Sequence, residues 1–400
     1  RVPAFARGLA GHFRAGGLLC IGHSESFDAH SVGLRLITNS IYSPIDGKDK
    51  TPVSAPGPAP IKGAKRALVV DDSGVVRKKL SSILVGAGFE VSEACDGMAA
   101  DREISKQAYD FITVDLHMPG DDGVTWIRKV RQKGNRTPAV MVSDSTLEDA
   151  PQILEVLGKE IHDFFDKKTL HSHPEYLIEK AKALTALVPA PRPVERSKNR
   201  KTLPDLGFSQ ADVILVGAST GGTTALIELL QNIPKPCPPV VVVQHITPNF
   251  LKPFAERLAR AAGLELGEST AGAHLKSGFL YMAHGDYHVG VGIEKGLLAL
   301  KTSTEGPISR HRPSVDYLFS TASQIAKHPI LGILMTGMGA DGASGLLQLK
   351  RAGGFTACQS EESCVVFGMP KEAIRMGADR FVGSIEELRS LFIKAGGKSS

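Results

Sequence analysis

Several features that define other protein classes are scarce or absent in this sequence of 400 residues. Its five cysteines include no CxxC pair, so we expect neither a disulfide framework nor a cysteine-bound metal, and reduced thiols fit a cytoplasmic protein. No apolar run reaches the ~20 residues of a membrane-spanning helix, so we expect no insertion into a membrane. The chain begins without methionine and without the layout of a signal peptide, which predicts a piece of a longer polypeptide.

A concentrated basic patch is also missing. The net charge is only +5, and the densest basic run, RPVERSKNRK at 192–201, lies in a stretch without apolar periodicity. Basic runs in linkers are usually just solvated, so we expect no nucleic-acid partner. What the chain does have is the composition of globular domains, with 42% hydrophobic and 22% charged residues. Its length predicts about two or three domains.

Two stretches of low hydrophobicity divide the chain. Residues 46–64 are rich in proline, glycine and alanine, and residues 188–210 form a second linker. They leave residues 1–45, too few to bury a core alone, and two larger segments, 65–187 and 211–395. In both larger segments, short apolar runs alternate with stretches of helical spacing. This alternation predicts the α/β class, with one doubly wound parallel sheet in each segment.

The last segment also contains a different pattern. Residues 278–292 and 296–302 alternate with a period of two and are punctuated by glycines. Such spacing is typical of an antiparallel ribbon, and we expect one here in addition to the parallel sheet.

Polar residues end several predicted strands of the middle segment. Asp71 and Asp72 end the first strand and Asp115 ends the third, so three carboxylates would crowd one sheet edge. They would repel one another unless a cation neutralised them, and oxygen ligands suit Mg²⁺. Ser143 and Lys167, at the next two strand ends, could hold the oxygens of a phosphoryl group on Asp115. The alternative is a set of helix N-caps and surface charges, but matching positions at successive strand ends argue against it.

A serine, a histidine and an aspartate end three predicted strands of the last segment. Ser219 lies in GASTG, which fits G-x-S-x-G, His245 ends VVVVQH, and Asp341 lies in GMGADG. These are the residue types of a nucleophile, a base and an acid that orients the base. The order serine, histidine, aspartate is not that of the α/β-hydrolases. Taken singly, Ser219 could be a helix N-cap and His245 a strand-end residue.

Two other interpretations compete for the same segment. GMGADG also matches the dinucleotide pattern G-x-G-x-x-G, but Asp341 inside the loop would repel a pyrophosphate, and the strand before it is a late one. His284 and His288 around Asp286 suggest zinc, yet the sequence offers no third ligand nearby. We therefore expect no cofactor for the chemistry at Ser219.

The middle segment resembles a response-regulator receiver over residues 66–187. This resemblance implies a flavodoxin-like fold that is phosphorylated with the help of Mg²⁺. It implies the phosphoacceptor Asp115, the switch residues Ser143 and Lys167, and the Mg²⁺ ligands Asp71, Asp72, Asp115 and the backbone carbonyl of His117. In this family proline usually follows the lysine, and Lys168 stands there instead, which puts the usual cis peptide bond in doubt.

The last segment is similar to the catalytic domain of the chemotaxis protein-glutamate methylesterases, the CheB family, over residues 211–393. The motifs are GASTGG, QHITPNF, GDYH, HRPSVDYLF, TGMGADGASG and SEESCVVFGMPKEAI. The resemblance implies a nucleophile, Ser219, a base, His245, and an orienting acid, Asp341. We expect the backbone amides of Thr220 and Met338 to bind the oxyanion.

The N-terminal residues carry a weaker resemblance. GGLLCIGHSESF and NSIYSP are similar to the C-terminal end of the chemotaxis receptor methyltransferases, the CheR family, over residues 1–45. The glycine-rich S-adenosylmethionine loop of that family is absent, so we expect no methyltransferase activity. The alternative is a leader that matches by chance.

Together the resemblances imply a cytoplasmic, phosphorylation-regulated serine esterase. It would remove methyl groups from glutamate methyl esters on methyl-accepting chemotaxis receptors, and deamidate glutamines there, with a chemotaxis histidine kinase as phosphodonor. The competing hypothesis is a non-enzymatic response regulator whose last module only binds a partner. An intact set of Ser219, His245 and Asp341 argues against that hypothesis.

Overall fold

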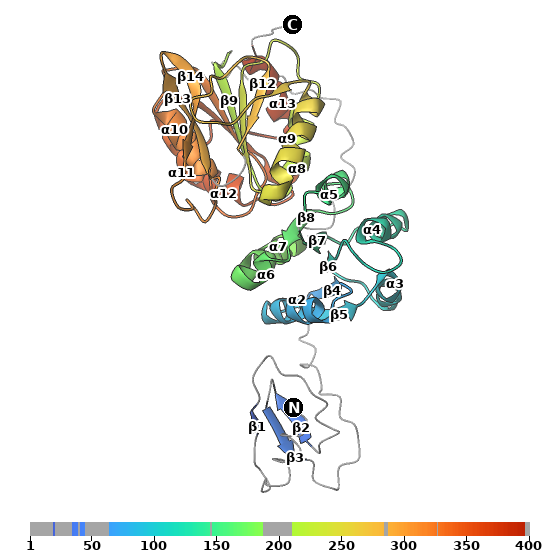
Figure 1. Cartoon of the computed structure of the whole chain (residues 1–400). Helices are drawn as coiled ribbons and strands as arrows, with labels where there is room; N and C mark the ends of the chain where they lie inside the picture. The colour runs from blue at the N-terminus through green and yellow to red at the C-terminus, as the bar shows by residue number, and fades with distance from the viewer. Residues whose placement is uncertain are drawn as a thin grey trace. The chain divides into compact units, whose positions relative to one another are not determined.

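The computed structural model describes residues 64–144, 146–186, 210–283, 287–325 and 327–396, together with the backbone of three short strands near the N-terminus. The chain divides into two compact units, Arg1–Ile61 and Lys62–Ser400. The first unit contains β1 (Leu19–Cys20), β2 (Leu34–Thr38) and β3 (Ile41–Pro44), paired antiparallel in the order β1-β3-β2 (Figure 1). The rest of the segment that resembles the methyltransferase tail lies outside the described residues, as do nearly all of both predicted linkers. The predicted domain boundaries stay predictions.

The second unit begins with a five-stranded parallel sheet in the order β5-β4-β6-β7-β8. Its strands are β4 (Arg66–Val70), β5 (Glu90–Ala94), β6 (Phe111–Val114), β7 (Ala139–Ser143) and β8 (Asp163–Asp166). Its helices are α2 (Gly74–Gly86), α3 (Gly97–Lys106), α4 (Gly123–Gln132), α5 (Ala150–Val156), α6 (Thr169–Ser172) and α7 (Pro174–Ala186). The central strand β6, FITV, is wholly buried, as expected for a strand with both faces covered by helices. This confirms the predicted doubly wound sheet.

A seven-stranded parallel sheet follows, in the order β11-β12-β10-β9-β15-β16-β17. Its strands are β9 (Val213–Ala218), β10 (Val240–Gln244), β11 (Glu265–Leu266), β12 (Phe279–Met282), β15 (Ile330–Leu334), β16 (Phe355–Gln359) and β17 (Phe381–Gly383). The chain leaves the central strand β9 first toward β10 and later returns on its other side as β15. In open α/β sheets, ligands commonly bind at such a reversal of strand order, which lies here at the carboxyl ends of β9, β10 and β15.

Helices cover both faces of the larger sheet (Figure 1). One face carries α8 (Gly222–Leu230), α9 (Pro248–Ala262) and α13 (Ile385–Ala395), and the other carries α10 (Val315–Ser323), α11 (Ala343–Arg351) and α12 (Met369–Arg375). Alternate residues of the strands supply the two cores: Ile214 and Val216 belong to one, Val213 and Leu215 to the other. Among the described residues, no helix combines the length and the apolar character needed to cross a membrane.

The expectation of an antiparallel ribbon over the whole of residues 278–302 is wrong in its first part. Phe279–Met282 forms β12, a parallel strand of the main sheet, with Val240 of β10 opposite Leu280. Its run of apolar residues suits a largely buried strand of a parallel sheet rather than the period-two alternation of a ribbon. The ribbon consists only of β13 (His288–Glu294) and β14 (Leu297–Ser303).

Candidate active site and metal centre

Ser219 lies immediately after β9, in the turn that leads into α8. The turn can be sharp because Gly221 adopts a φ of 79°. Within β9, the glycine at 217 allows α10 to pack closely, since a β-carbon there would come within 2.1 Å of Val315. The amide of Ser219 donates a hydrogen bond to the carbonyl oxygen of Thr336 at 3.0 Å. The serine is only 9% exposed and stands at the N-terminal end of a helix, where backbone N–H groups favour negative charge.

His245 comes directly after β10, the strand beside β9. Its amide donates to the carbonyl oxygen of Ala218 at 3.0 Å, so His245 and Ser219 follow two paired strand ends. The Nε2 atom lies 2.9 Å from Oδ2 of Asp341. Nδ1 is buried, and within the described ranges it has no hydrogen-bond partner. The side chain of Gln244 donates to the carbonyl oxygens of Ser219 at 2.8 Å and His245 at 2.9 Å, which ties the two strand ends together.

Asp341 lies on the loop between β15 and α11, and it is 2% exposed. The start of α10 donates three hydrogen bonds to its carboxylate, from the hydroxyl of Ser314 at 2.7 Å and the amides of Val315 at 2.7 Å and Asp316 at 3.0 Å. Burial alone would raise the pKa of Asp341, but the interactions with His245 and with these donors outweigh burial and lower it to about 2. Asp341 is therefore ionised at neutral pH.

The predicted oxyanion donors lie on two loops that meet at Ser219. A β-carbon on Gly337 would lie 2.8 Å from Cβ of Ser219, so the loop after β15 passes directly beside the serine. The amide of Gly368 donates to the carbonyl oxygen of Gly337 at 3.0 Å, which holds that loop in place. In the described parts of the chain, no hydrogen bond uses the amide N–H of Thr220 or of Met338. Both groups therefore remain available to an oxyanion.

This arrangement suits proton transfer from a serine to a histidine. The ionised Asp341 holds Nε2, which leaves Nδ1 of His245 to accept the proton of the Ser219 hydroxyl. Among the described residues, Ser219 Oγ makes no direct hydrogen bond to the ring, and such bonds are often formed only when substrate is bound.

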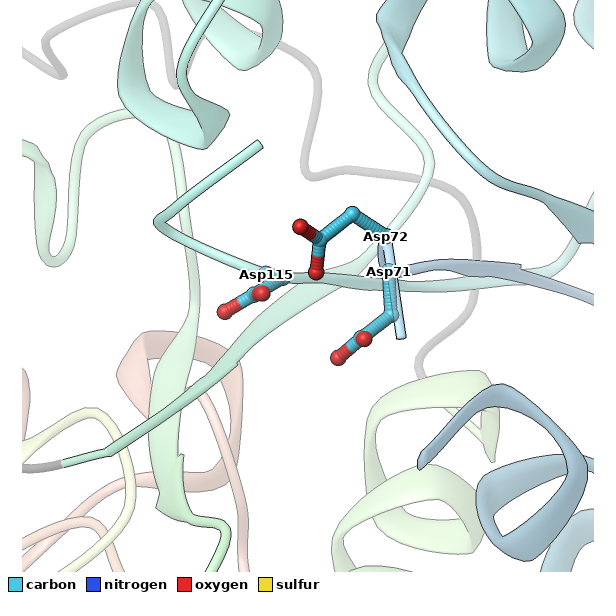
Figure 2. A group of neighbouring side chains, drawn as sticks. All are labelled: Asp71, Asp72 and Asp115. Carbon is cyan, nitrogen blue, oxygen red and sulfur yellow. The ribbon is translucent and has the colours of Figure 1, made fainter. Parts of the chain in front are cut away.

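Asp71, Asp72 and Asp115 form a compact acidic group at the ends of β4 and β6 (Figure 2). One carboxylate oxygen of each lies within 4.8 Å of those of the other two. Lys167, which follows β8, places Nζ 2.9 Å from Oδ2 of Asp71 and 2.8 Å from Oδ2 of Asp115. The other oxygen of Asp115, Oδ1, is buried, and no residue in the described part of the chain hydrogen-bonds to it. An oxygen-rich group with an unpaired buried carboxylate oxygen fits a hard divalent cation such as Mg²⁺.

The pKa values of this group also favour a bound cation. Burial raises the pKa of both Asp71 and Asp115, and the hydrogen bonds from Lys167 offset that effect only in part. Burial also lowers the pKa of Lys167, but the two carboxylates outweigh it, and the pKa of the ammonium is raised. The ammonium stays charged, while the carboxylates still lack positive charge that a cation would supply.

The remaining predicted residues of this centre lie around the same sheet edge. The hydroxyl of Ser143 is buried and has no hydrogen-bond partner among the described residues, so it is available to a phosphoryl oxygen. The side chain of His117 is directed to Asp149, at 3.1 Å, and only its backbone carbonyl is a possible ligand. Within the described ranges the cis peptide bonds precede Pro236 and Pro313, so the Lys167–Lys168 bond is trans.

Comparisons with known proteins match both larger segments of the chain. The family profile of CheB methylesterase matches residues 214–392, and that of the response regulator receiver domain matches residues 67–181. A protein-glutamate methylesterase/protein-glutamine glutaminase 1 of Anaeromyxobacter dehalogenans is 40% identical over 333 residues, 79% of this chain and 94% of that protein. The chain belongs to the CheB methylesterase family.

Two further CheB proteins show the range of similarity. The protein-glutamate methylesterase/protein-glutamine glutaminase of Salmonella typhimurium is 36% identical over 321 residues, which cover 78% of this chain and 91% of the relative. The crystal structure of the Thermotoga maritima CheB methylesterase catalytic domain is 35% identical, covers 46% of this chain and 98% of that one, and has a TM-score of 0.44.

The competing interpretations of the CheB segment find no support. His284 and Asp286 lie outside the described residues, and both ring nitrogens of His288 are engaged, Nε2 with the carbonyl of Gly306 at 3.1 Å and Nδ1 with the amide of Ser314 at 3.1 Å. His288 is thus a buried structural residue. The ionised carboxylate of Asp341, inside the GMGADG loop, would repel a dinucleotide phosphate bound to that loop.

Sequence reasoning missed the residues that hold the reactive groups. Gln244, which ties the serine and histidine strand ends together, and Ser314 and Asp316, which bind the aspartate, were not singled out. The motifs QHITPNF and HRPSVDYLF contained them, and a buried polar residue beside a candidate base was the available signal.

Proposed function

We propose that this chain hydrolyses glutamate methyl esters, and deamidates glutamines, on methyl-accepting chemotaxis receptors in the cytoplasm. The observation that carries the proposal is the placement of Ser219, His245 and Asp341 at three adjacent strand ends, with Nδ1 of His245 free and Nε2 held by an ionised carboxylate. The names of the relatives, protein-glutamate methylesterase/protein-glutamine glutaminase, supply the substrate class.

The proposed reaction uses two half-reactions at Ser219. The serine hydroxyl attacks the ester carbonyl as its proton passes to Nδ1 of His245, and Asp341 stabilises the imidazolium that forms. The amides of Thr220 and Met338 bind the oxyanion of the tetrahedral intermediate. Its collapse breaks the bond to methoxide, which leaves as methanol with the proton from His245. Water then hydrolyses the acyl-enzyme by the same route, and with glutamine the leaving group is ammonia.

The alternative function is a response regulator whose last module binds a partner without catalysis. Release of methanol from methylated receptor membranes separates the two hypotheses. The purified full chain should release methanol with multiple turnovers, whereas a binding module would release none above the rate of the membranes alone.

Phosphorylation should require Mg²⁺. A bound Mg²⁺ ion would neutralise charge on the incoming phosphoryl group. Asp71 and Asp72 would hold it beside Asp115, whose Oδ1 is unpartnered, and the Ser143 hydroxyl and Lys167 ammonium would face the phosphoryl oxygens. We expect acetyl phosphate to label the wild type only when Mg²⁺ is present, as intact-mass spectrometry would show.

A matched pair of variants tests the ligand assignment. Asp72→Asn should lose most of the labelling, because it removes one carboxylate of the group, and Glu155→Gln, at an exposed carboxylate of α5, should label normally. Full labelling of wild type in excess EDTA would contradict the metal site.

We further propose that the unphosphorylated receiver restrains the esterase through α7. Lys180 Nζ on α7 donates a hydrogen bond to Oγ1 of Thr220, next to the nucleophile, at 3.4 Å. The ring centroids of Tyr176 on α7 and His311 are 6.4 Å apart. Glu179, also on α7, places Oε1 3.4 Å from Nη1 of Arg310. The helix therefore contacts the loops that carry the active site, and substrate would have to displace it.

Phosphorylation of Asp115 should relieve this restraint. We expect acetyl phosphate with Mg²⁺ to raise the methanol-release rate by roughly 5- to 150-fold, the usual range of coupling between two sites. Asp115→Asn should hold the rate low, and deletion of residues 1 to about 200 should raise the basal rate. Equal rates for wild type and Asp115→Asn, with and without the phosphodonor and matching the truncated chain, would mean that the receiver does not gate this site.

A further inference from the structure

The imidazole of His311 lies face to face with the imidazole of His245. The two ring centroids are 3.8 Å apart and the ring planes differ by 9°. Both ring nitrogens of His245 already have a role: Nε2 is hydrogen-bonded to Asp341, and Nδ1 accepts the proton of Ser219 in the proposed reaction. His311 therefore covers a face of the base, a position for which the proposed reaction has so far given no role.

The backbone around His311 is built to hold the ring there. Ile308 and His311 exchange two backbone hydrogen bonds, at 3.1 and 2.9 Å, around a turn whose central residues Ser309 and Arg310 have φ of 51° and 70°. A positive φ is uncommon for residues other than glycine and costs free energy, so neighbouring groups must maintain the turn.

One residue links this turn to the acid of the triad. The hydroxyl of Ser309 donates to Oδ2 of Asp316 at 3.0 Å, and the amide of Asp316 donates to Asp341 at 3.0 Å. The turn that carries His311 and the carboxylate that holds His245 are thus fixed to the same point at the start of α10.

With α7 in contact with the active-site loops, the His311 ring is uncharged at neutral pH. Burial, and then the charges of His245, Arg310 and Lys180, lower its pKa, and the opposing effect of Asp341 is smaller, so that the pKa falls to about 3. A neutral ring over His245 does not repel the imidazolium that forms when the base takes a proton, as a cationic side chain would.

We propose that His311 is a positioning residue for the base: its ring fixes the plane of the His245 imidazole, so that Nε2 stays on Asp341 and Nδ1 stays available to Ser219. This inference rests on the proposed esterase function. A single hydrogen bond at Nε2 leaves the ring free to turn about that bond, because the torsion that orients a histidine ring has a broad energy minimum. Contact over the ring face removes that freedom, and displacements of about 1 Å can cost a hundredfold in rate.

The test compares three substitutions in the full chain, with acetyl phosphate and Mg²⁺ present so that the receiver does not limit the rate. His311→Ala and His311→Asn, whose side chains have no ring, should lower kcat by roughly 10- to 100-fold and change KM by less than about twofold. His311→Phe, which keeps a flat aromatic face, should retain kcat within about threefold. His328→Ala, at an exposed histidine paired with Asp212, is the control and should match wild type.

A second measurement does not depend on turnover. The ¹⁵N NMR signals of the His245 ring should show one tautomer, protonated at Nε2, in wild type and His311→Phe, and averaged tautomers in His311→Ala. Wild-type kcat in His311→Ala, or equal losses in the alanine and phenylalanine variants at unchanged melting temperature, would overturn the proposal. If the wild type releases no methanol while the NMR pattern holds, the proposed function fails and the positioning role stands.

Discussion

Replacing Ser219 with alanine should abolish methanol release from methylated receptors and leave the fold intact. The serine is the only group in the proposed reaction that forms a bond to the substrate, so its loss removes the acyl-enzyme route altogether. We expect kcat to fall by roughly 10⁵- to 10⁶-fold. The melting temperature should stay close to that of wild type, because the change removes one oxygen atom and the amide of residue 219 still donates to Thr336.

The control for this substitution is Ser390→Ala, on the exposed side of α13, which should turn over normally. His245→Ala should lose nearly as much activity as Ser219→Ala, and the double variant should be no worse than either, because the residues of a catalytic unit act together. A Ser219→Ala chain that releases methanol at a rate near that of wild type would remove the serine mechanism.

The parts of the fold that follow from local pattern could be predicted from the sequence. Buried strands such as VILVGA and helices of 3.6 periodicity alternate along the chain, and in parallel sheets the carboxyl ends of neighbouring strands share one edge. That rule alone predicted that Ser219, His245 and Asp341 would come together, and that Asp71, Asp72 and Asp115 would do the same. In the structure His245 is hydrogen-bonded to Asp341, Ser219 follows the strand paired with that of His245, and the three aspartates lie together.

What could not be predicted depends on contacts between distant segments. The run FLYM has the apolar character of either a ribbon or a buried strand, and only the free edge of β10 decides between them. His311 and His245 are far apart in sequence, and no motif around either residue predicts that their rings stack. Side-chain partners of this kind are set by tertiary packing, which periodicity does not encode.

Replacing Asp341 with asparagine should also cause a large loss of activity, through the tautomer of His245. The carboxylate accepts hydrogen bonds at both oxygens: the Ser314 hydroxyl and the Asp316 amide bind Oδ1, and the Val315 amide binds Oδ2, which also meets Nε2 of the histidine. An asparagine side chain has one oxygen and one NH₂ group. The NH₂ group cannot accept a hydrogen bond, so the groups that donate to one of the two carboxylate oxygens lose their acceptor. Some loss of stability should accompany the change, since a buried hydrogen bond is broken.

The orientation with its oxygen toward Asp316 is favoured, because Oδ1 receives two of the three donors from α10. The NH₂ group then donates to Nε2 of His245, which moves the ring proton to Nδ1, the nitrogen that must accept the proton of Ser219. We expect kcat to fall by roughly 10³- to 10⁴-fold, somewhat less than for Ser219→Ala, with KM little changed. Asp212→Asn, at an exposed ion pair with His328, is the matched control and should keep wild-type kcat. If Asp341→Asn kept the kcat of that control while its His245 ring carried the proton on Nδ1, the proposed direction of proton transfer through this histidine would be wrong.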